Sequence, residues 1–536
     1  MRTSTSLTRR WKKNVTRKEK QQKYSLEERM ILTKENKNDF SIILALYFYR
    51  ALSSDQIYRL GVTGMKKNTL WSKMTYLTER KVIKTIVDTD KPTGSLNSKY
   101  RYILTDLGLQ VILDVLQIPL KLRGEPKQYF SLMDLRLGSQ KKHHYLSVDW
   151  VSRVQQRIKP LQIPDSEWRR YLNGDPNIST TIYKPDWIMY EPHIVHNTII
   201  ENERFDLHPF VYPLTIRDEV LTEKYSELSE GRTWDWKSFY KPMLVLEMDT
   251  GTMNHKELKN KYLTILDTLK REQDRANLPK LLVFCNYVER FSPRFNEDKT
   301  DNLVLELHPN SKKRLRNTRK YMCEVLHQSL LEDELTVLHG DEFETVIRAA
   351  DYISNNQQFV FPERLNDLSY LQKLFSNHSS NLSIFTPASE QGKAWCDLTS
   401  YGAGLPDFIV KQDDVNRIND RFNSTAQKID FVYYARNGWV NPQLKAATFE
   451  KWIKSGGEWP FVSQIRVILL YPSSKEFHDD IFPVKFSTNI YFASFEELEV
   501  ERKWDEMYVR VPVFKKGIRW EKITGVISAE AGVEDE

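Results

Sequence analysis

Two carboxylates, Glu247 and Asp249, stand one residue apart directly after the apolar residues 243–246 in the segment PMLVLEMDTGT. Side chains two residues apart on a β-strand point to the same face of its sheet. Two carboxylates held together at the end of a buried strand repel each other, so they require a cation, a proton or a basic partner. The spacing therefore predicts either a site for a hard metal ion or an internal ion pair.

A third acid, Asp186, follows Pro185 in the short apolar segment KPDWIMY. A Pro-Asp pair on one strand and an acidic pair on the next strand can hold Mg²⁺ or Mn²⁺, which prefer oxygen ligands. Such a metal would polarise a phosphodiester and activate water, while a lysine stabilises the developing charge. If the protein is an enzyme, we predict the metal ligands Asp186, Glu247 and Asp249, with Lys259 or Lys261 near the scissile phosphate; otherwise we predict no cofactor.

The elements around these residues follow an order that suits such a site. The sequence predicts a helix at 143–158, a strand at 183–190, the strand with the acidic pair, a helix at 255–272 and a buried strand at 278–287. The predicted helix after the acidic pair carries the lysines. The insert at 191–241 is rich in aromatic residues and is interpreted as a lid or a packing element.

The sequence pattern from residue 38 onward predicts a separate N-terminal unit. Apolar residues recur at helical spacing in 38–52, in a short helix at 53–61 and in a third helix at 66–83. Ser53 or Ser54 would cap the second helix and Gly61 would end it. The strands VIKTIVDTD and SKYRYILT then flank the turn KPTG, and Thr105 would cap a further helix. Three helices followed by a hairpin form a winged helix, which reads DNA with its third helix.

The outer faces of this third helix and of the hairpin are polar and basic. We predict that double-stranded DNA is contacted by the helix residues Lys66, Lys67, Asn68, Thr69, Ser72 and Lys73 and by the hairpin residues Lys91, Lys99 and Arg101. The alternative is a winged helix used for protein contacts. A homodimer would fit this class of domain, because paired half-sites are usually read by two copies.

The layout of the acidic residues resembles the PD-(D/E)XK nuclease-like superfamily, and the first 290 residues resemble the replication-relaxation family of plasmids and other mobile elements. The segments that carry this resemblance are ALSSDQIYRL, SKYRYILTDLG, KPDWIMY and LEMDTGT. It implies DNA binding and a role in the replication, relaxation or transfer of a mobile element, together with other replication or transfer proteins. The chain departs from the superfamily at Asp249, which stands where a lysine is expected. A nuclease fold kept as an inactive scaffold is therefore the alternative.

The C-terminal part repeats the pattern in degraded form. GLPDFIV at 404–410 mirrors KPDWIMY, and KIDFVYYARNGWVNPQLKAATFEKW at 428–452 mirrors the acidic strand and its helix. In this alignment Tyr433 stands opposite Glu247 and Ala435 opposite Asp249, while Asp407 and Lys445 remain. We predict a second, degenerate nuclease-like copy; an ordinary turn acid is the alternative for Asp407.

Composition limits the classes of protein that the chain can belong to. Its 536 residues are 40% hydrophobic and 28% charged, which suits several globular domains. No apolar run reaches the ~18 residues of a membrane span, no secretory signal is present, and three cysteines without a CxxC pair favour the reducing cytoplasm. The net charge is +7, and basic residues concentrate in 1–23 and in SKKRLRNTRKY at 311–321. Such runs are either solvated segments or phosphate clamps.

These observations predict an α/β (α+β) chain in five parts. They are a basic arm at 1–37, a winged helix-turn-helix at 38–120, a PD-(D/E)XK domain of restriction-endonuclease type at 121–335, a helical linker at 336–383 and a degenerate nuclease-like domain at 384–536. The predicted function is that of a cytoplasmic DNA-binding protein of a mobile element, with metal-dependent endonuclease activity if the acids are catalytic. The alternative is an inactive nuclease-fold protein that regulates through DNA binding or docks a partner.

Overall fold

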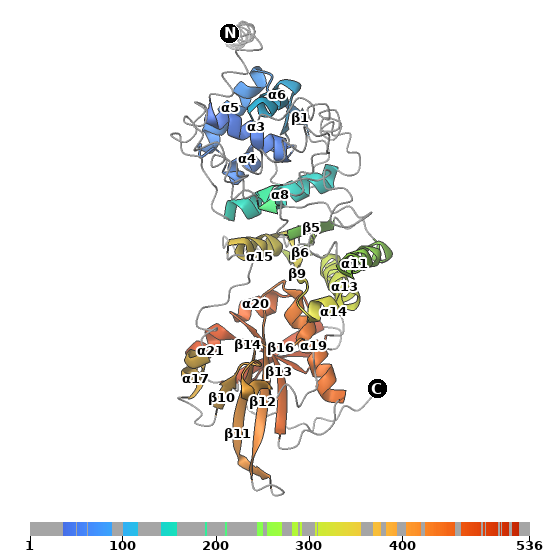
Figure 1. The fold of residues 1–536 in the computed structure, drawn as a ribbon, viewed down its shortest axis with the longest axis vertical. Coiled ribbons are helices and arrows are strands. Elements are labelled where there is room, and N and C mark those ends of the chain that lie inside the picture. The colour runs from blue at the N-terminus through green and yellow to red at the C-terminus, as the bar shows by residue number, and fades with distance from the viewer. Residues whose placement is uncertain are drawn as a thin grey trace, which may run out of the picture. The chain divides into compact units, whose positions relative to one another are not determined.

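The computed structural model describes residues 36–49, 51–61, 63–87, 100–115, 141–157, 188–189, 210–211, 244–249, 254–270, 281–287, 290–291, 306–307, 309–354, 368–376, 382–393, 404–419, 424–455, 462–483, 486–487, 489–501, 504, 506–513 and 517–524. They form a mixed α/β fold (Figure 1). The chain divides into two compact units, Met1–Met248 and Asp249–Glu536. None of the helices in these ranges is both long and apolar enough to cross a membrane.

The first unit begins with three helices and an antiparallel hairpin. The helices are α3 (Lys37–Tyr49), α4 (Ser54–Leu60) and α5 (Lys67–Glu79), and the hairpin strands are β1 (Ile83–Val87) and β2 (Tyr100–Leu104). Leu52, between α3 and α4, adds an isolated antiparallel bridge to Tyr102 of β2. The order of elements predicted for 38–104 is confirmed.

Local hydrogen bonds define both ends of α4. The Ser53 hydroxyl accepts the Gln56 N–H at 3.2 Å, and the Gln56 side chain accepts the Ser53 N–H at 2.9 Å. This reciprocal capping box satisfies two backbone donors that the helix itself leaves unpaired. Gly61 ends the helix in the left-handed region at φ 66°, which costs glycine little because it has no Cβ. The caps predicted from the sequence are confirmed.

Two more helices belong to the described part of the first unit. α6 (Asp106–Val115) begins after Thr105, whose hydroxyl accepts the Gly108 N–H at 3.3 Å, as predicted for its cap. α8 (Lys141–Arg157) packs against α4, and its Asp149 forms an ion pair with Arg59 of α4. α8 lies within the range predicted for the nuclease-like domain, and its contacts with α4 belong to the first unit. The short strands β3 (Ile188–Met189) and β4 (Phe210–Val211) pair with each other.

The second unit contains two larger sheets, and the boundary between the units falls inside β5 (Leu244–Asp249). The smaller sheet has the order β5–β6–β9, in which β6 (Leu281–Asn286) and β9 (Thr336–Asp341) run parallel. α11 (His255–Lys270) follows β5, and α13 (Pro309–Val325) and α14 (His327–Leu331) precede β9. α11 and α13 pack against each other (Figure 1). The short strands β7 (Arg290–Phe291) and β8 (Glu306–Leu307) form a separate pair.

The predicted helical linker at 336–383 is wrong at its start. Thr336–Asp341 is strand β9, in which every residue after Thr336 is buried, and only then do the helices α15 (Glu342–Ser354) and α17 (Leu368–Ser376) follow. A buried strand of six residues carries no periodicity that distinguishes it from a piece of helix. Its pairing with β6 therefore settles the assignment.

The larger sheet has seven strands in the order β10 (Leu382–Phe385), β11 (Phe408–Asn419), β12 (Ser424–Tyr434), β13 (Val462–Tyr471), β14 (Ile490–Ser494), β15 (Glu506–Val513) and β16 (Gly517–Thr524). The pairs from β10 to β12 and from β14 to β16 are antiparallel, whereas β12, β13 and β14 run parallel. The two parallel steps contain α19 (Val440–Ser455) and α20 (Ser474–Asp479), as parallel neighbours require crossovers. α21 (Phe495–Glu501) follows β14.

Helices cover both faces of this sheet. Phe431 of β12 packs in a buried cluster with Phe449 of α19, whereas its neighbour Val432 packs in another cluster with Leu371 of α17. Successive residues of a strand point to opposite faces, so both positions must be apolar. This explains the continuous apolar run that the sequence shows in β12 and β13.

The two sheets of the second unit meet at residues 438–441. The Gly438 carbonyl accepts the His339 N–H of β9 at 2.8 Å. Gly438 has φ 86°, and a Cβ there would lie 3.1 Å from the Leu338 side chain, so both conformation and space favour glycine. The Asn441 side chain accepts the Val337 N–H at 3.0 Å and donates to the Leu335 carbonyl at 2.6 Å. These bonds attach the start of α19 to β9.

α11 and α19 share their length and the backbone direction of one residue in the strand before each helix. Both helices have 16 residues. The Asp249 carbonyl accepts the Tyr287 N–H at 2.8 Å, and the Ala435 N–H donates to the Leu470 carbonyl at 2.9 Å, so both residues direct their backbone toward the strand that follows the helix. Successive residues of a strand direct their backbone N–H and C=O groups to opposite sides. Asp249 and Ala435 direct theirs to the same side, toward the following strand. The predicted alignment of these two residues agrees with this shared direction.

Candidate functional site

The first half of α5 presents a polar and basic surface to solvent. As predicted, the exposed residues here include Lys66, Lys67, Asn68, Thr69 and Ser72. The opposite side of α5 is apolar and buried through Leu70, Met74 and Leu77. Trp71 lies among the polar residues and is 54% exposed. A surface that combines lysines, an amide and an exposed indole can bind both the phosphates and the base edges of DNA.

Two residues predicted to contact DNA point elsewhere. Lys73 lies 2.5 Å from the carboxylate of Asp39, which is 1% exposed, and burial followed by the charge of Arg80 lowers the pKa of Lys73. A buried carboxylate needs such a cation. Arg101 is 2% exposed and donates to the Gln56 side chain at 2.6 Å. The prediction that Arg101 reaches a DNA backbone from the surface is therefore wrong for this structure. Lys91 and Lys99 lie outside the described residues.

The end of β5 is closed by an arginine. Arg314 of α13 donates from Nε and Nη2 to the two carboxylate oxygens of Asp249, each at 2.7 Å. Asn286 of β6 donates to the same carboxylate at 2.7 Å. Asp249 is 4% exposed. A bidentate guanidinium forms strong, charge-assisted hydrogen bonds to a carboxylate, so Asp249 has an internal ion pair.

This arrangement does not fit a metal centre as it stands. Both oxygens of Asp249 already accept hydrogen bonds, so a cation would have to displace Arg314. Glu247 is 2% exposed on the same strand, and Asp186 lies outside the described residues. Within the described ranges, no group of three His, Cys, Asp or Glu side chains could hold a metal ion.

The two lysines predicted to assist catalysis lie on α11. Lys259 is exposed, with its Nζ 3.7 Å from Glu324 of α13 and 5.0 Å from the centre of the Tyr321 ring. Lys261 is half-buried. The structure therefore associates Lys259 with the surface of α13, while Arg314 of that helix provides the charge beside Asp249.

A chain of buried polar side chains leads inward from Asp249. Arg319 Nε donates to His339 Nδ1 at 3.2 Å, which requires that the imidazole proton sits on Nε2. His339 Nε2 then donates to Oδ1 of the Asn286 side chain at 2.9 Å, and Asn286 Nδ2 donates to Asp249. Burial, followed by the charge of Arg319, lowers the pKa of His339 well below its ordinary value. The imidazole is therefore neutral, and the donors all point toward the carboxylate.

Arg319 connects this chain to the second sheet. It is fully buried, lies 2.8 Å from Asp480 and 3.1 Å from the Gln443 side chain, and donates to the His339 carbonyl at 2.6 Å. Asp480 also accepts the Tyr471 hydroxyl at 2.7 Å. A buried ion pair with these additional hydrogen bonds is held in a single geometry.

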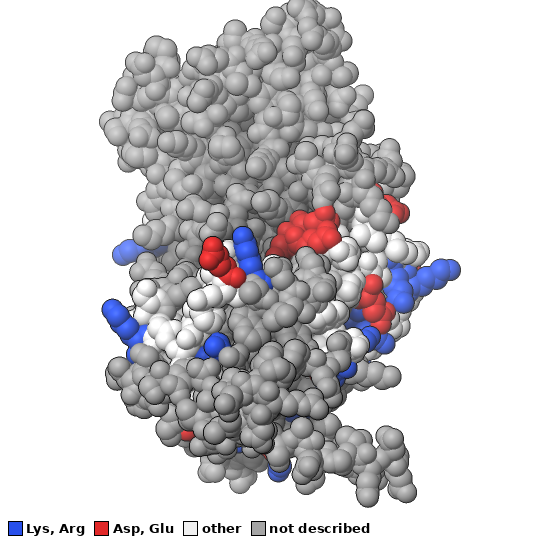
Figure 2. All heavy atoms as spheres, turned by 60° about the horizontal axis from the view of Figure 1, so that its bottom comes forward, with Lys and Arg blue, Asp and Glu red and all other residues white. Residues whose placement is uncertain are grey.

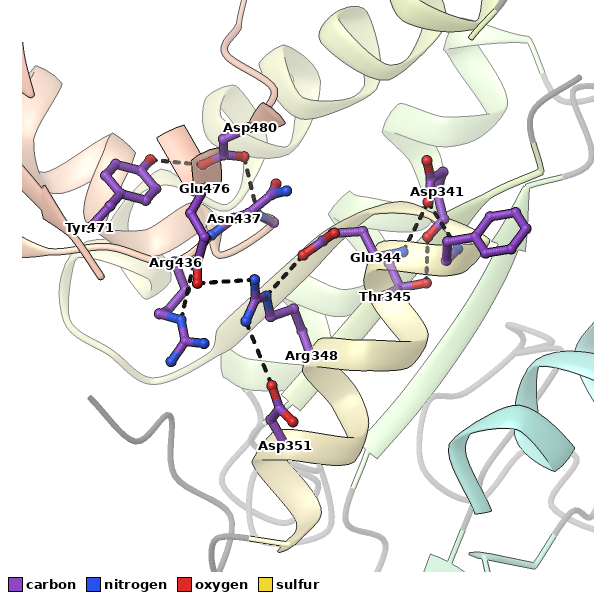
Figure 3. A network of polar contacts seen from close by, with 12 residues as sticks. Asp341, Glu344, Thr345, Arg348, Asp351, Arg436, Asn437, Tyr471, Glu476 and Asp480 are labelled. Carbon is purple, nitrogen blue, oxygen red and sulfur yellow. Dashed lines mark hydrogen bonds and ion pairs between the residues drawn. The ribbon is translucent and has the colours of Figure 1, made fainter. Parts of the chain in front are cut away.

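A second group of charges joins α15 to α20 (Figure 3). Arg348 of α15 donates to Glu344 at 2.9 Å and lies 3.3 Å from Glu476 of α20, which also contacts Arg436 at 3.1 Å. Burial raises the pKa of Glu344 to about 7, although Arg348 opposes this shift. The charge of Glu344 therefore changes near neutral pH.

The raised pKa of Glu344 predicts a pH-dependent stability. The folded-state pKa of about 7 exceeds the ordinary value of 4.5, so this group favours folding below pH 4.5 and loses that contribution as pH rises through 7. Relative to the wild type, Glu344→Gln should gain about 2 kcal/mol of unfolding free energy between pH 5 and pH 8. Urea unfolding of both proteins at the two pH values measures this difference. Glu324→Gln, an exposed glutamate of α13, is the control, and an equal pH dependence in Glu344→Gln and the wild type would refute the prediction.

In the predicted alignment of the two copies, Asp407 stands opposite Asp186. Asp407 directly precedes β11, and its carboxylate accepts the Tyr434 N–H at 2.7 Å. Burial raises its pKa to about 6, against the effects of that bond and of Lys445. Tyr433, which stands opposite Glu247 in the alignment, donates its hydroxyl to the Gly404 carbonyl at 3.1 Å. Lys445 forms an ion pair with Asp333.

Sequence reasoning missed the residues that close the acidic strand. The basic run at 311–321 predicts no internal role, yet two of its arginines, Arg314 and Arg319, point inward to carboxylates. The available signal concerns Arg319, which stands four residues after Leu315 and three before Met322, at the spacing of one helix face. Asn286 and His339 carry no motif, because they meet only when β6 and β9 pair.

Surface charge on the face shown in Figure 2 is mixed. Among the described residues there, basic and acidic side chains lie side by side, so this face has no single sign of charge. Comparison of the chain with protein-family models, with curated proteins and with solved structures finds no match.

Proposed function

We propose that this protein binds double-stranded DNA through α5 and acts in the replication, relaxation or transfer of a mobile element, with a nuclease-like core that binds rather than cuts. The exposed first half of α5, with Lys66, Lys67, Asn68 and Trp71, carries the proposal. Lysines bind phosphates, the amide can pair with adenine, and an apolar ring can contact a thymine methyl group.

The arrangement of the first unit supports a winged helix. Three helices precede an antiparallel hairpin, and the Leu52–Tyr102 bridge ties the connection between α3 and α4 to that hairpin. α5 is the third helix, the one that enters the major groove in this class. Its buried face is apolar and its exposed face polar, so it can pack on its own unit and contact DNA at the same time.

The second unit supports a nuclease-like core. Around the larger sheet the order is α17, β10, β11 preceded by Pro406-Asp407, β12, α19 with Lys445, and β13. The sequence predicts the same order for such a core: a Pro-Asp pair, then a strand that aligns with the acidic strand, then a helix that bears a lysine. The ion pair between Asp249 and Arg314 favours a core that does not cut, because the guanidinium occupies both carboxylate oxygens.

Incubation with supercoiled plasmid tests this proposal. The wild type should shift the plasmid in a gel at low salt without nicking it, in Mg²⁺, in Mn²⁺ and in EDTA alike, because Asp249 stays paired with Arg314. The conversion of supercoiled to open-circular or linear DNA is measured. Cutting that needs metal and disappears in Glu247→Gln would refute the binding-only core, and absence of any DNA binding would refute the proposed function.

A metal-dependent endonuclease is the second candidate. It is favoured by the burial of two carboxylates one residue apart at a strand end, and by Arg314, whose side chain is 26% exposed. If movement of Arg314 opened the site, Arg314→Gln should cut plasmid in Mn²⁺ whereas the wild type does not. The same assay therefore distinguishes the two candidates.

A further inference from the structure

The second unit exposes a basic surface on α11 and α13, two helices that pack against each other. α13 carries six basic residues and one acid, Glu324. Arg314 and Arg319 point inward to Asp249 and Asp480. The other four basic residues are Lys312, Lys313, Arg316 and Lys320. One helix thus separates its basic residues into a buried structural pair and an outer group.

The outer group has few acidic neighbours. Within the described residues, no ion pair forms to Lys312, Lys313 or Arg316, all of which are exposed, while Lys320 lies 3.5 Å from Glu324. α11 adds the exposed residues Lys256 and Lys259. Its Glu257 is engaged at the start of the helix, where it accepts the Asn254 N–H at 2.8 Å. The two helices together carry three carboxylates, Glu257, Asp267 and Glu324, against the six cationic side chains of this surface.

Two further observations indicate that the surface lacks an anionic partner. Tyr321 of α13 has two cations and a histidine beside it: its ring centre is 5.0 Å from Lys259 Nζ, 5.9 Å from Lys320 Nζ and 5.0 Å from the His255 ring. On the other side, Arg510 of β15 is 7% exposed, and burial followed by the charge of Arg316 lowers its pKa to about 10. Like charges that lie near each other repel, and a bound anion would relieve that repulsion.

We propose that the outer face of α11 and α13, defined by Lys256, Lys259, Lys312, Lys313, Arg316 and Lys320, is a second nucleic-acid surface that binds the phosphodiester backbone. It extends the proposed function, on which it rests, because it lies in a different unit from α5. An extended strand of phosphates matches it because Lys312, Arg316 and Lys320 recur every four residues and form one stripe of the helix. Backbone binding of this kind is independent of sequence and depends on salt.

Fluorescence anisotropy with a labelled 30-nucleotide strand and with the matching duplex tests the surface. The triple variant Lys312→Gln, Arg316→Gln and Lys313→Gln should lose about tenfold or more in affinity at 50 mM salt. The magnitude of the slope of the logarithm of the binding constant against the logarithm of the salt concentration should fall by about two for the oligonucleotide that occupies the surface. The matched control replaces the exposed residues Lys393, Lys451 and Lys475 by Gln, removes the same charge, and should leave the slope unchanged.

The outcomes separate this inference from the proposed function. If the triple variant and the control behave alike while a variant of α5 loses binding, the second surface is refuted and the function stands. If the wild type binds neither oligonucleotide, both fail. Poly-glutamate that competes as well as the oligonucleotide would overturn the assignment to nucleic acid. Whichever oligonucleotide shows the loss of slope identifies the bound form as single or double strand.

Discussion

Replacing Arg319 by methionine should lower the free energy of unfolding of the second unit by about 3–5 kcal/mol, because it leaves the Asp480 carboxylate buried without its cation. Both side chains of this pair are fully buried. Methionine has similar volume, so packing changes little, and the loss is electrostatic. With a urea dependence of about 1–3 kcal/mol per molar, the unfolding midpoint should fall by more than about 1 M.

The position also allows matched controls. Lys320→Met changes the next residue, which is 41% exposed and 3.5 Å from Glu324, and should alter stability by less than about 0.5 kcal/mol. Adding Asp480→Asn to Arg319→Met removes the uncompensated charge and should restore part of the loss. A urea midpoint for Arg319→Met within 0.3 M of the wild type corresponds to a loss of about 1 kcal/mol or less in the free energy of unfolding. This result would contradict a stabilising role of Arg319 as the cation for Asp480.

The second large effect is expected on DNA affinity. The triple variant Lys66→Ala, Lys67→Ala and Asn68→Ala removes the exposed basic and amide groups at the start of α5 and should weaken binding at least about 100-fold. Each base contact of this type contributes about 1–3 kcal/mol. The probe is a duplex that the wild type selects from a random library, measured by anisotropy at fixed salt.

The control for α5 keeps the same change in charge elsewhere in the first unit. Lys81→Asn, Gln110→Ala and Arg157→Ala alter exposed residues outside α5, and asparagine tolerates the φ of 59° at Lys81. Thermal unfolding shows whether either variant loses its fold, since Lys67 also pairs with Asp55. Equal affinities for the α5 variant and this control would remove α5 from the DNA interface.

The hydrogen-bonded side chains around Arg319 connect distant elements of the second unit. They join the end of β5 to α19 and α20 and are all buried, from Asp249 through Asn286 and His339 to Asp480. Movement of Arg314 would remove two of the hydrogen bonds that the Asp249 carboxylate accepts. The plasmid assay with Arg314→Gln tests whether this change permits cutting.

Local patterns determined much of the element order. Alternating and continuous apolar runs placed β5, β6, β12 and β13, and helical periodicity placed α5, α11 and α19. Ser53, Gly61 and Thr105 marked helix ends because capping depends on neighbouring backbone groups alone. The same local signals could not identify β9, since a short buried run has no distinguishing period.

The sequence alone also determined that two carboxylates share the end of a strand and that they need a partner. It could not select that partner, because a metal ion, Lys259 and Arg314 satisfy the same electrostatic requirement. The tertiary structure selected Arg314, which lies 65 residues beyond Asp249, by packing α13 beside α11 and the end of β5. It likewise turned Arg101 and Lys73 inward, since each neutralises or satisfies a buried group in another element. The sequence determines which residues are charged and how they are spaced, but the packing of distant elements determines which charges form pairs.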